Sequence, residues 1–223
     1  AKALQGGIGT LLSVVRPEAP EALIVHSQPS MHVLYAQAAI PVGRPIKDGY
    51  SRYAASDEAL AQCLIRNGLN YRYILPEQLT PARLEGVKLI VLPSCVALPD
   101  EAGKALATFA ANGGRLLADL PPGTHDEHGS PRDDAARFST LFAGDRGVCL
   151  GRSANQDSTD ALDKAVATLG IHGAVRWQTA DGRPPQRVRM YRFRLGRTRY
   201  LGILPAAAPE VEAEGPLTID LPE

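Results

Sequence analysis

The stretch from Lys88 to Asp119 most constrains what this chain can fold into. It opens with Lys88–Pro93, a short apolar run without alternation, which is typical of a strand buried on both faces. Helix signals follow: proline and two acids at Pro99–Glu101, helically spaced apolar residues, and Gly113–Gly114 as the stop. Arg115–Asp119 is a second buried strand. The order strand, helix, strand predicts a right-handed parallel crossover and therefore an open α/β sheet.

Further strands are predicted on both sides of this unit. Ala22–Ser27 is the first, and its polar end, His26 and Ser27, would lie at the mouth of the sheet. Asn70–Leu75 is the second, and it leads through the helical link Pro76–Glu85 into the central strand. Val148–Leu150 is a short strand beyond the central unit.

Two more helices carry recognisable start signals. The first is predicted to begin at the cap Ser56–Asp57 and to present an apolar stripe from Ala59 to Leu64. The second is capped by Asp157 or Ser158 and ends at Gly170. On both helices the apolar residues recur at helical spacing, so each buries one face.

Two segments resist a simple assignment. In Pro29–Tyr53, Met31–Ala39 fits a helix, but the prolines and glycines that follow predict a long loop. Residues 1–20 are predicted to be a lead-in linker. The glycines in Gly6–Gly9 do not indicate a phosphate loop, because no strand precedes them and no Gly-Lys-Ser/Thr follows.

From Ala174 onward the pattern changes to β, which places a domain boundary near Gly173. Val175–Thr179, Arg187–Leu195 and Thr198–Leu204 are predicted strands, and the last two form a hairpin. The hairpin interleaves arginines with aromatic residues, as nucleic-acid platforms do. However, neither face of the alternation is purely basic, and acids lie close in sequence. A strand surface paired with acids, or one that docks on other parts of a larger protein, is the favoured interpretation.

Composition excludes several function classes. The 24 lysines and arginines equal the 24 aspartates and glutamates, so bulk charge indicates neither nucleic acid nor membrane as a partner. No apolar run approaches the roughly 18 residues of a membrane helix, and no signal peptide is visible. Three widely spaced cysteines match neither a disulfide framework nor a zinc pattern, which fits the cytoplasm. Because the chain starts without methionine and stops just after a strand, we expect a piece of a longer protein.

The alternation of strands and helices up to Gly170 resembles the class I glutamine amidotransferase-like fold, a flavodoxin-like relative. Three segments, Lys88–Pro93, Gly113–Leu116 and Gly123–Gly129, together with the acidic helix start, resemble the trimerisation domain of family 42 β-galactosidases. The resemblance implies an open parallel sheet with helices on both faces. It covers most of the chain, although many of the matching features are general to α/β folds.

In that family the domain follows a catalytic (β/α)8 barrel and precedes a small β-domain. The resemblance therefore implies a lead-in at residues 1–20, an amidotransferase-like domain at 21–173, and the start of the small β-domain at 174–223. The barrel is absent, and with it the two glutamates of glycosidic chemistry. The implied role is a non-catalytic accessory and oligomerisation domain. Its partners would be the barrel of the parent chain and the other copies of a trimer, without cofactor or metal.

Relatives with this fold do catalyse, so an enzyme remains an alternative. Amidotransferases carry a nucleophilic cysteine on a strand-to-helix elbow, but the corresponding segment Leu117–Pro122 has no cysteine. Its two prolines hold their φ angles at about −65°. This excludes the elbow, which requires a positive φ. Cys95, just past the central strand, is a second candidate nucleophile, with His26, His125 or His128 as its base. A thiol hydrolase using Cys95 is the less favoured hypothesis, since no Cys-His spacing fixes such a pair.

A binding module is the other alternative. Ligands of open α/β folds bind at the carboxyl edge of the sheet. The residues expected to line that crevice, for a sugar or another small polar ligand, are His26, Ser27, Ser94, Cys95, Asp119, His125 and Asp126. The tetrad His125–His128 also has two histidines three apart, yet flanking prolines and glycines predict a loop rather than a zinc-binding helix. A solvated or interface loop is therefore favoured over a metal site.

Overall fold

The computed structural model describes residues 4–39, 47–154, 159–182, 185, 188–205 and 217–220. The chain divides into two compact units, one of Pro20–Gly173 and one of Ala1–Ala19 together with Ala174–Glu223. Some sequence predictions lie outside the described residues: the loop from Pro41 to Pro45, the helix cap at Asp157 or Ser158, and the first residue of the strand from Arg187.

A five-stranded parallel sheet forms the centre of the larger unit. Its strands are β2 (Ala22–Val25), β3 (Tyr71–Ile74), β4 (Leu89–Leu92), β5 (Arg115–Ala118) and β6 (Gly147–Cys149). They pair in the order β3-β2-β4-β5-β6, which is the flavodoxin-like order. Every residue of β2 and β4 is buried, because helices cover both faces of the sheet. The predicted α/β fold class is confirmed.

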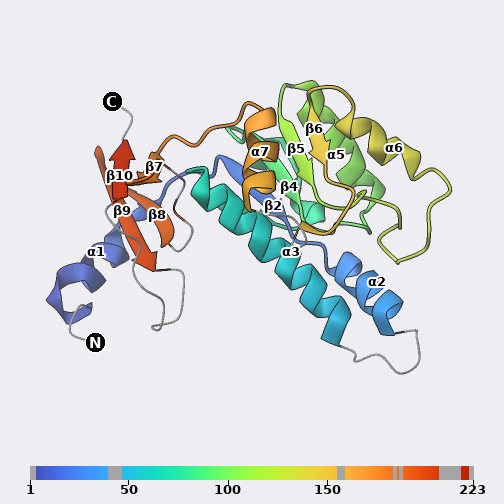
Figure 1. Cartoon of the computed structure of the whole chain (residues 1–223), viewed down its shortest axis with the longest axis horizontal. Helices are drawn as coiled ribbons and strands as arrows, with labels where there is room; N and C mark the ends of the chain where they lie inside the picture. Colours follow the sequence, from blue (N-terminus) through green and yellow to red (C-terminus); the bar gives the residue numbers. More distant parts are fainter. Residues whose placement is uncertain are drawn as a thin grey trace. The chain divides into compact units, whose positions relative to one another are not determined.

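The helices of this unit are α2 (Gln28–Ala39), α3 (Lys47–Arg66), α4 (Pro81–Leu84), α5 (Asp100–Ala111), α6 (Ala136–Ser139) and α7 (Thr159–Thr168), with short 3-10 turns at Pro76–Gln78 and Thr140–Phe142. Helices α3 and α7 pack on one face of the sheet and α5 on the other (Figure 1). These two apolar layers are the core of the unit.

Helix α5 has the features that the sequence predicted for the central crossover. Asp100 and Glu101 lie in its first turn, and its apolar stripe is buried against β4 and β5. The ring of Phe109 covers the backbone where the chain turns into β5. A Cβ added at Gly114 would lie 2.3 Å from that ring, so this approach requires glycine.

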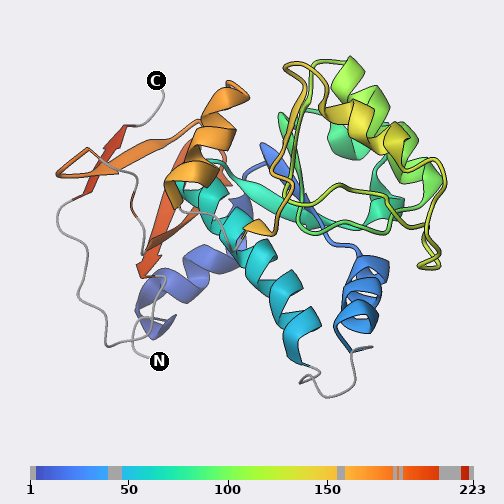
Figure 2. The same ribbon diagram turned by 45° about the vertical axis from the view of Figure 1, so that its right-hand side comes forward.

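Helix α3 begins at Lys47, well before the predicted cap at Ser56–Asp57. The predicted start is therefore wrong, and so is the predicted loop over residues 47–53. The physical reason is tertiary: Tyr53 is only 2% exposed and is tied to His26 and Ser27 at the end of β2. Ser56 is itself buried inside the helix. The helix expected at Met31–Ala39 is confirmed as α2, and α2 and α3 lie side by side (Figure 2).

The smaller unit is built mainly from antiparallel strands. They are β1 (Arg16–Pro17), β7 (Arg176–Thr179), β8 (Val188–Leu195), β9 (Thr198–Pro205) and β10 (Leu217–Asp220). Before β1 lie a segment at Leu4–Ile8, whose backbone is not helical at Gly6 and Gly7, and helix α1 (Gly9–Val14). Strands β1, β8 and β9 form one sheet, and β10 pairs with β7. The predicted hairpin is confirmed. The first 20 residues, expected to be a linker, contribute a helix and an edge strand to this unit.

Candidate functional site

The carboxyl ends of β2, β4 and β5 meet at one edge of the sheet, as parallel pairing requires. The predicted crevice residues that directly follow these strands are therefore brought together. Ser27, Ser94, Cys95 and Asp119 are all buried there, while His26 is half-buried. Over the residues that the structure describes, this edge is thus occupied by buried side chains of the chain itself, and we call it the filled edge.

Asp119 is the centre of this edge. Its Oδ1 accepts hydrogen bonds from the backbone N–H of Ser94 at 2.5 Å and of Leu120 at 2.7 Å. Its Oδ2 accepts from the Ser94 hydroxyl at 2.9 Å and from the N–H of Ala154 at 3.2 Å. Ser94 adopts φ +48°, which is uncommon for a residue other than glycine. The carboxylate is therefore bonded within the fold on both oxygens.

Cys95 is fully buried directly beside Ser94. Its thiol donates to the carbonyl oxygens of Val25 at 3.4 Å and Pro93 at 3.5 Å. Burial, followed by the nearby carboxylates of Asp119 and Asp57, raises the pKa of the Cys95 thiol well above its usual value. A thiolate nucleophile needs the opposite, a lowered pKa and access to solvent. The geometry thus makes Cys95 a packing residue.

Ser27 joins the end of β2 to the start of α2. Its hydroxyl donates to the carbonyl of Ala97 at 2.7 Å and accepts from the hydroxyl of Ser30 at 2.8 Å. The N–H of Ala97 in turn donates to Ser30 Oγ at 2.8 Å. This small buried network fixes the helix start against the loop after β4. Ser30 was not singled out in the sequence, because its role depends on Ala97, which is distant in the chain.

His26 faces residues of α3. Its Nδ1 lies 3.3 Å from the hydroxyl of Tyr53, and the two rings meet edge to face at 5.6 Å. Close by, the Tyr73 hydroxyl donates to Asp57 at 2.7 Å, and burial raises the pKa of Asp57. Burial likewise raises the pKa of Tyr53 and Tyr73. Sequence reasoning missed Tyr53 and Asp57, which it had placed in a loop and at a helix cap.

His125 and Asp126 lie in the loop after β5, where His125 forms an isolated β-bridge with Ala97, the residue whose carbonyl bonds to Ser27. Asp126 Oδ1 accepts hydrogen bonds from the N–H groups of His128 and Ser130, both at 2.9 Å. These bonds, that of Ser130 first, lower the pKa of Asp126. His125 bonds to Val96 through its backbone N–H, and its ring lies 2.9 Å from the Thr124 hydroxyl. Asp126 therefore holds its own loop in shape.

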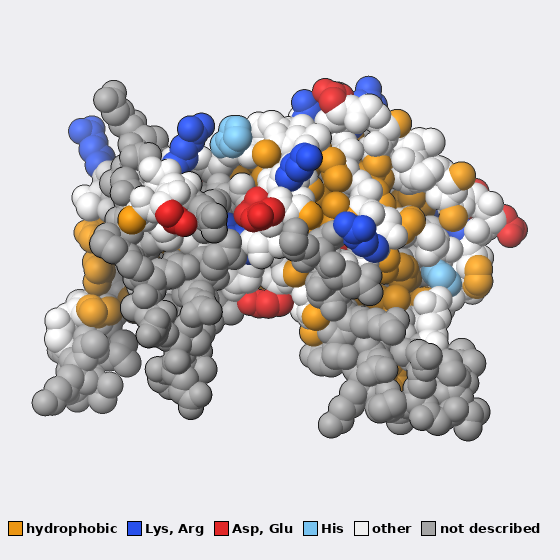
Figure 3. All heavy atoms as spheres, viewed as in Figure 1, with side chains coloured by type: hydrophobic (Ala, Val, Ile, Leu, Met, Phe, Trp, Pro, Cys, Tyr) orange, Lys and Arg blue, Asp and Glu red, His pale blue; other side chains and the backbone are white. Residues whose placement is uncertain are grey.

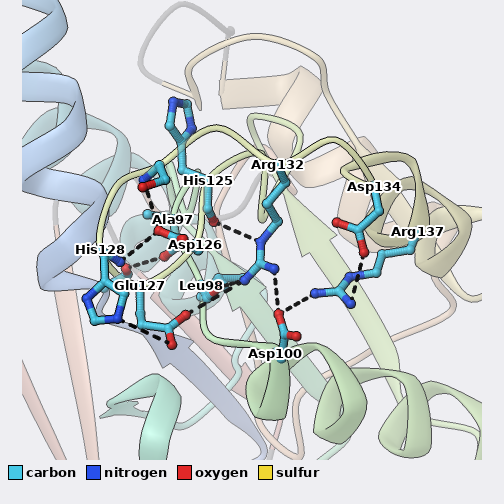
Figure 4. A network of polar contacts seen from close by, with 12 residues as sticks. Ala97, Leu98, Asp100, His125, Asp126, Glu127, His128, Arg132, Asp134 and Arg137 are labelled. Carbon is cyan, nitrogen blue, oxygen red and sulfur yellow. Dashed lines mark hydrogen bonds and ion pairs between the residues drawn. The ribbon is translucent and has the colours of Figure 1, made fainter.

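Arg132 fastens this loop to the start of α5 (Figure 4). Its side chain, 10% exposed, donates to the carbonyls of His125 at 3.2 Å and Leu98 at 2.6 Å, and to the carboxylate of Asp100 at 2.5 Å. Arg137 binds the same carboxylate. Together, Arg137 and Arg132 lower the pKa of Asp100. The sequence analysis did not identify these contacts, which we call the Arg132 clamp. The run of basic and acidic residues after Pro131 was the signal that could have indicated ion pairs here.

The loop of residues 121–132, held by Asp126 and Arg132, is called the fastened loop below. A groove of about 620 Å³ lies between this loop and α2. Its lining is mixed, with apolar residues from the helix and polar groups from both sides. The polar members are Gln28, His32, Gln37, His125, Glu127 and His128. Over the part of the chain that the structure describes, no group of histidine, cysteine or acidic side chains is arranged to hold a metal ion. The groove thus includes His125, one of the residues predicted to line the crevice.

Comparisons with known proteins identify the fold. No protein family model matches the chain, and a search of curated proteins found no match. A solved β-galactosidase from Bacillus circulans sp. alkalophilus matches with a TM-score of 0.67 and 12% identity, covering 92% of this chain and 38% of that one. A cold-adapted β-galactosidase from Rahnella sp. R3 gives 0.62 and 12%, covering 91% and 39%.

A catalytic mutant of a GH42 β-galactosidase from G. stearothermophilus also matches, with a TM-score of 0.63 and 14% identity. The match covers 91% of this chain and 36% of that chain. At such identities the likeness shows the fold, and at that level it confirms the resemblance to family 42 β-galactosidases. This chain spans less than two-fifths of the length of each of these three enzymes.

Proposed function

We propose that this chain is a non-catalytic accessory and oligomerisation domain of a β-galactosidase-like glycoside hydrolase. Residues 21–173 would be the amidotransferase-like domain and residues 174–223 the start of a small β-domain. The observation that carries the proposal is the filled carboxyl edge of the sheet. In open α/β folds that edge is where ligands bind.

The filled edge argues against catalysis by the described residues. The carboxylate of Asp119 is engaged by four donors, and Ser27 and Ser94 are bonded to neighbouring segments. Cys95 combines full burial with a raised pKa. A site of this kind holds segments together and offers no exposed nucleophile. The likeness to a part of longer β-galactosidase chains supports the same conclusion.

The fastened loop is the surface we propose for association. Its tip is exposed, with the side chains of Glu127 at 44% and His128 at 80%, while Asp126 and Arg132 hold its backbone. A preformed loop loses little conformational entropy on docking. A closed ring of three copies needs two different complementary surfaces. The loop from residue 121 to 132 would form one of them, with the barrel of the parent chain adding to the interface.

Charge distribution fits a protein partner better than a polyanion. Basic and acidic side chains are interspersed over the face seen in Figure 3. The formal net charge is zero, so the overall charge does not favour nucleic acid or an anionic membrane as a partner. None of the described helices combines the length and apolar composition that a membrane crossing requires. The described cysteines are free thiols, which agrees with the proposed location in the cytoplasm.

An activity assay tests the non-catalytic role. The isolated chain is expected to hydrolyse neither aryl galactosides nor glutamine, because the glutamates of glycosidic chemistry would lie in the barrel and the Cys95 thiol is buried with a raised pKa. Each substrate is incubated with wild-type chain, with the Cys95→Ala variant and with buffer. Turnover well above the buffer blank that disappears in the Cys95→Ala variant would replace the proposal with a thiol hydrolase.

A binding module is the second candidate, and the groove beside α2 is the observation that favours it. Amide and imidazole groups with a carboxylate can hydrogen-bond the hydroxyls of a sugar. Titration with galactose, followed by amide chemical shifts, would detect such binding. Saturable shifts confined to α2 and the loop, lost in a Gln28→Ala and Gln37→Ala double variant, would favour this function.

A further inference from the structure

The donors around Asp119 come from three segments that are distant in the sequence. Ser94 follows β4, Leu120 follows β5, and Ala154 lies beyond β6. Three backbone N–H groups and one hydroxyl converge on a single fully buried carboxylate. All four donors find acceptors on the two carboxylate oxygens.

This arrangement has the features of an anion-binding site. Backbone N–H groups that point into one concavity bind phosphate, carboxylate and developing oxyanions in many proteins. The positive φ of Ser94 aims its N–H into the site, at a conformation that normally costs free energy. The N–H of Ala154 is shared, since it also lies 3.1 Å from Ser56 Oγ. Every hydrogen bond described for this carboxylate comes from a neutral donor.

We propose that Ser94, Leu120 and Ala154 form a built-in anion site at the edge of the sheet, with Asp119 as its covalently attached occupant. Removal of the side chain would leave a site for a free carboxylate the size of formate or acetate. The Asp119 carboxylate links the loop after β4 and the loop after β5 to the segment after β6 through its hydrogen bonds. The site therefore holds these three segments in place at the edge of the sheet. This inference does not depend on the proposed role in oligomerisation.

Chemical rescue tests the proposal. The Asp119→Gly variant exposes four unpaired donors to an empty space, and its melting temperature is expected to fall by roughly 10 °C. Sodium formate should restore much of this loss along a saturation curve, whereas sodium chloride at equal ionic strength should not. The Asp119→Asn variant should resist rescue, because its amide fills the space while its NH₂ group cannot accept a hydrogen bond.

A matched control separates the site from general salt effects. Glu21 is a second buried acid, and its carboxylate pairs with the Lys88 ammonium at 2.9 Å and accepts one longer bond, at 3.4 Å, from the N–H of Asn70. Among the hydrogen bonds that the structure describes, it therefore has one backbone donor where Asp119 has three. The Glu21→Gly variant should show the same small response to formate and chloride. Equal rescue of Asp119→Gly by the two salts, or equal formate rescue of both glycine variants, would overturn the proposal.

Two further measurements test the proposal even if the Asp119→Gly variant does not fold stably. Refolding yield of Asp119→Gly should rise with formate and stay low in chloride; identical yields would count against the site. In the wild-type chain, the amide protons of Ser94, Leu120 and Ala154 should resonate downfield and exchange slowly. Exchange of these protons at the rate of exposed loop amides would show that the carboxylate is not held as proposed.

Discussion

At the scale of single residues, the roles at the sheet edge follow from burial rather than from residue type. Cys95, Ser94 and Asp119 are types that enzymes use, and they follow adjacent strands. In this fold each of them is enclosed and bonded to the backbone of a neighbouring segment. The same residue types at an open edge would indicate chemistry, whereas here they stabilise loop ends.

Thiol labelling checks this conclusion for the cysteines. Burial raises the pKa of all three thiols, but only Cys149 is half-exposed. We expect iodoacetamide to label Cys149 first, with Cys63 and Cys95 labelled roughly 100-fold more slowly than in urea. Peptide mass spectrometry resolves the three rates. Labelling of native Cys95 at the urea rate would mean that the thiol is accessible.

Phe109 and Gly114 offer a second test at this scale. Truncation of the buried ring in Phe109→Ala is expected to cost about 3–5 kcal/mol of unfolding free energy. Gly114→Ala should cost about 1–3 kcal/mol because its Cβ meets that ring, and most of this cost should vanish in the double variant. Urea unfolding measures each free energy.

The neighbouring glycine is the matched control for this cycle. Gly113 has φ +91° and open space around it, so Gly113→Ala is destabilising through backbone strain alone. Its cost should be the same with and without the Phe109 ring. Equal costs of Gly114→Ala in both backgrounds, or a Phe109→Ala variant that melts within a degree or two of wild type, would contradict the described packing.

At the scale of elements, the loop after β5 combines an exposed tip with a fastened base. Asp126 closes the turn from inside, and Arg132 joins the loop to Asp100 at the start of α5. Both aspartates have lowered pKa values in the folded chain. Their stabilising effect is therefore present above the unfolded pKa of about 4 and is lost as pH falls through the lower folded value.

Acid should accordingly loosen this loop before the sheet. Protection of the His128 and Ser130 amides against hydrogen exchange is expected to fall as the pH is lowered from about 4 through the lower folded pKa of Asp126, while Ile90 in β4 stays protected. An Asp126→Asn variant keeps the acceptor oxygen but cannot titrate, so its turn should respond less to pH. Protection of wild-type His128 and Ser130 that stays unchanged until Ile90 also loses its protection would contradict the role of Asp126.

The elements differ in how far the sequence predicted them. Strands β2, β4 and β5 and helix α5 were predicted because their signals are local: apolar runs, first-turn acids and terminal glycines. The start of α3 was missed because Tyr53 is held by His26 and Ser27, which precede it by more than 20 residues. No local pattern records such a contact.

The candidate site was predictable only in part. The order of strands placed Ser27, Ser94, Cys95 and Asp119 at one edge, since parallel strands end together. Whether that edge is open or filled depends on side-chain directions and on Ala154, which no motif marks. The position of His125 depends on its β-bridge with Ala97 and on the contacts of Arg132 with Asp100 and Leu98, which span more than 30 residues and leave no local pattern in the sequence.

At the scale of the whole molecule, two features support the proposed role: the filled edge of the sheet and the preformed exposed loop. A chain with these features is suited to hold other surfaces in place. The three β-galactosidases compared with it share this fold, and the chain spans less than two-fifths of the length of each. We expect the isolated chain to associate weakly, because the barrel of the parent would supply part of the interface.

Light scattering on the full-length polypeptide that carries this domain is the most direct test. The account predicts a trimer at micromolar concentration. Truncation of the two exposed side chains at the loop tip, in a Glu127→Ala and His128→Ala double variant, should raise the dissociation constant of the trimer at least about tenfold. A control substitution at the exposed Arg83 of α4 should leave the trimer unchanged. A full-length protein that remains strictly monomeric at high micromolar concentration would contradict the account.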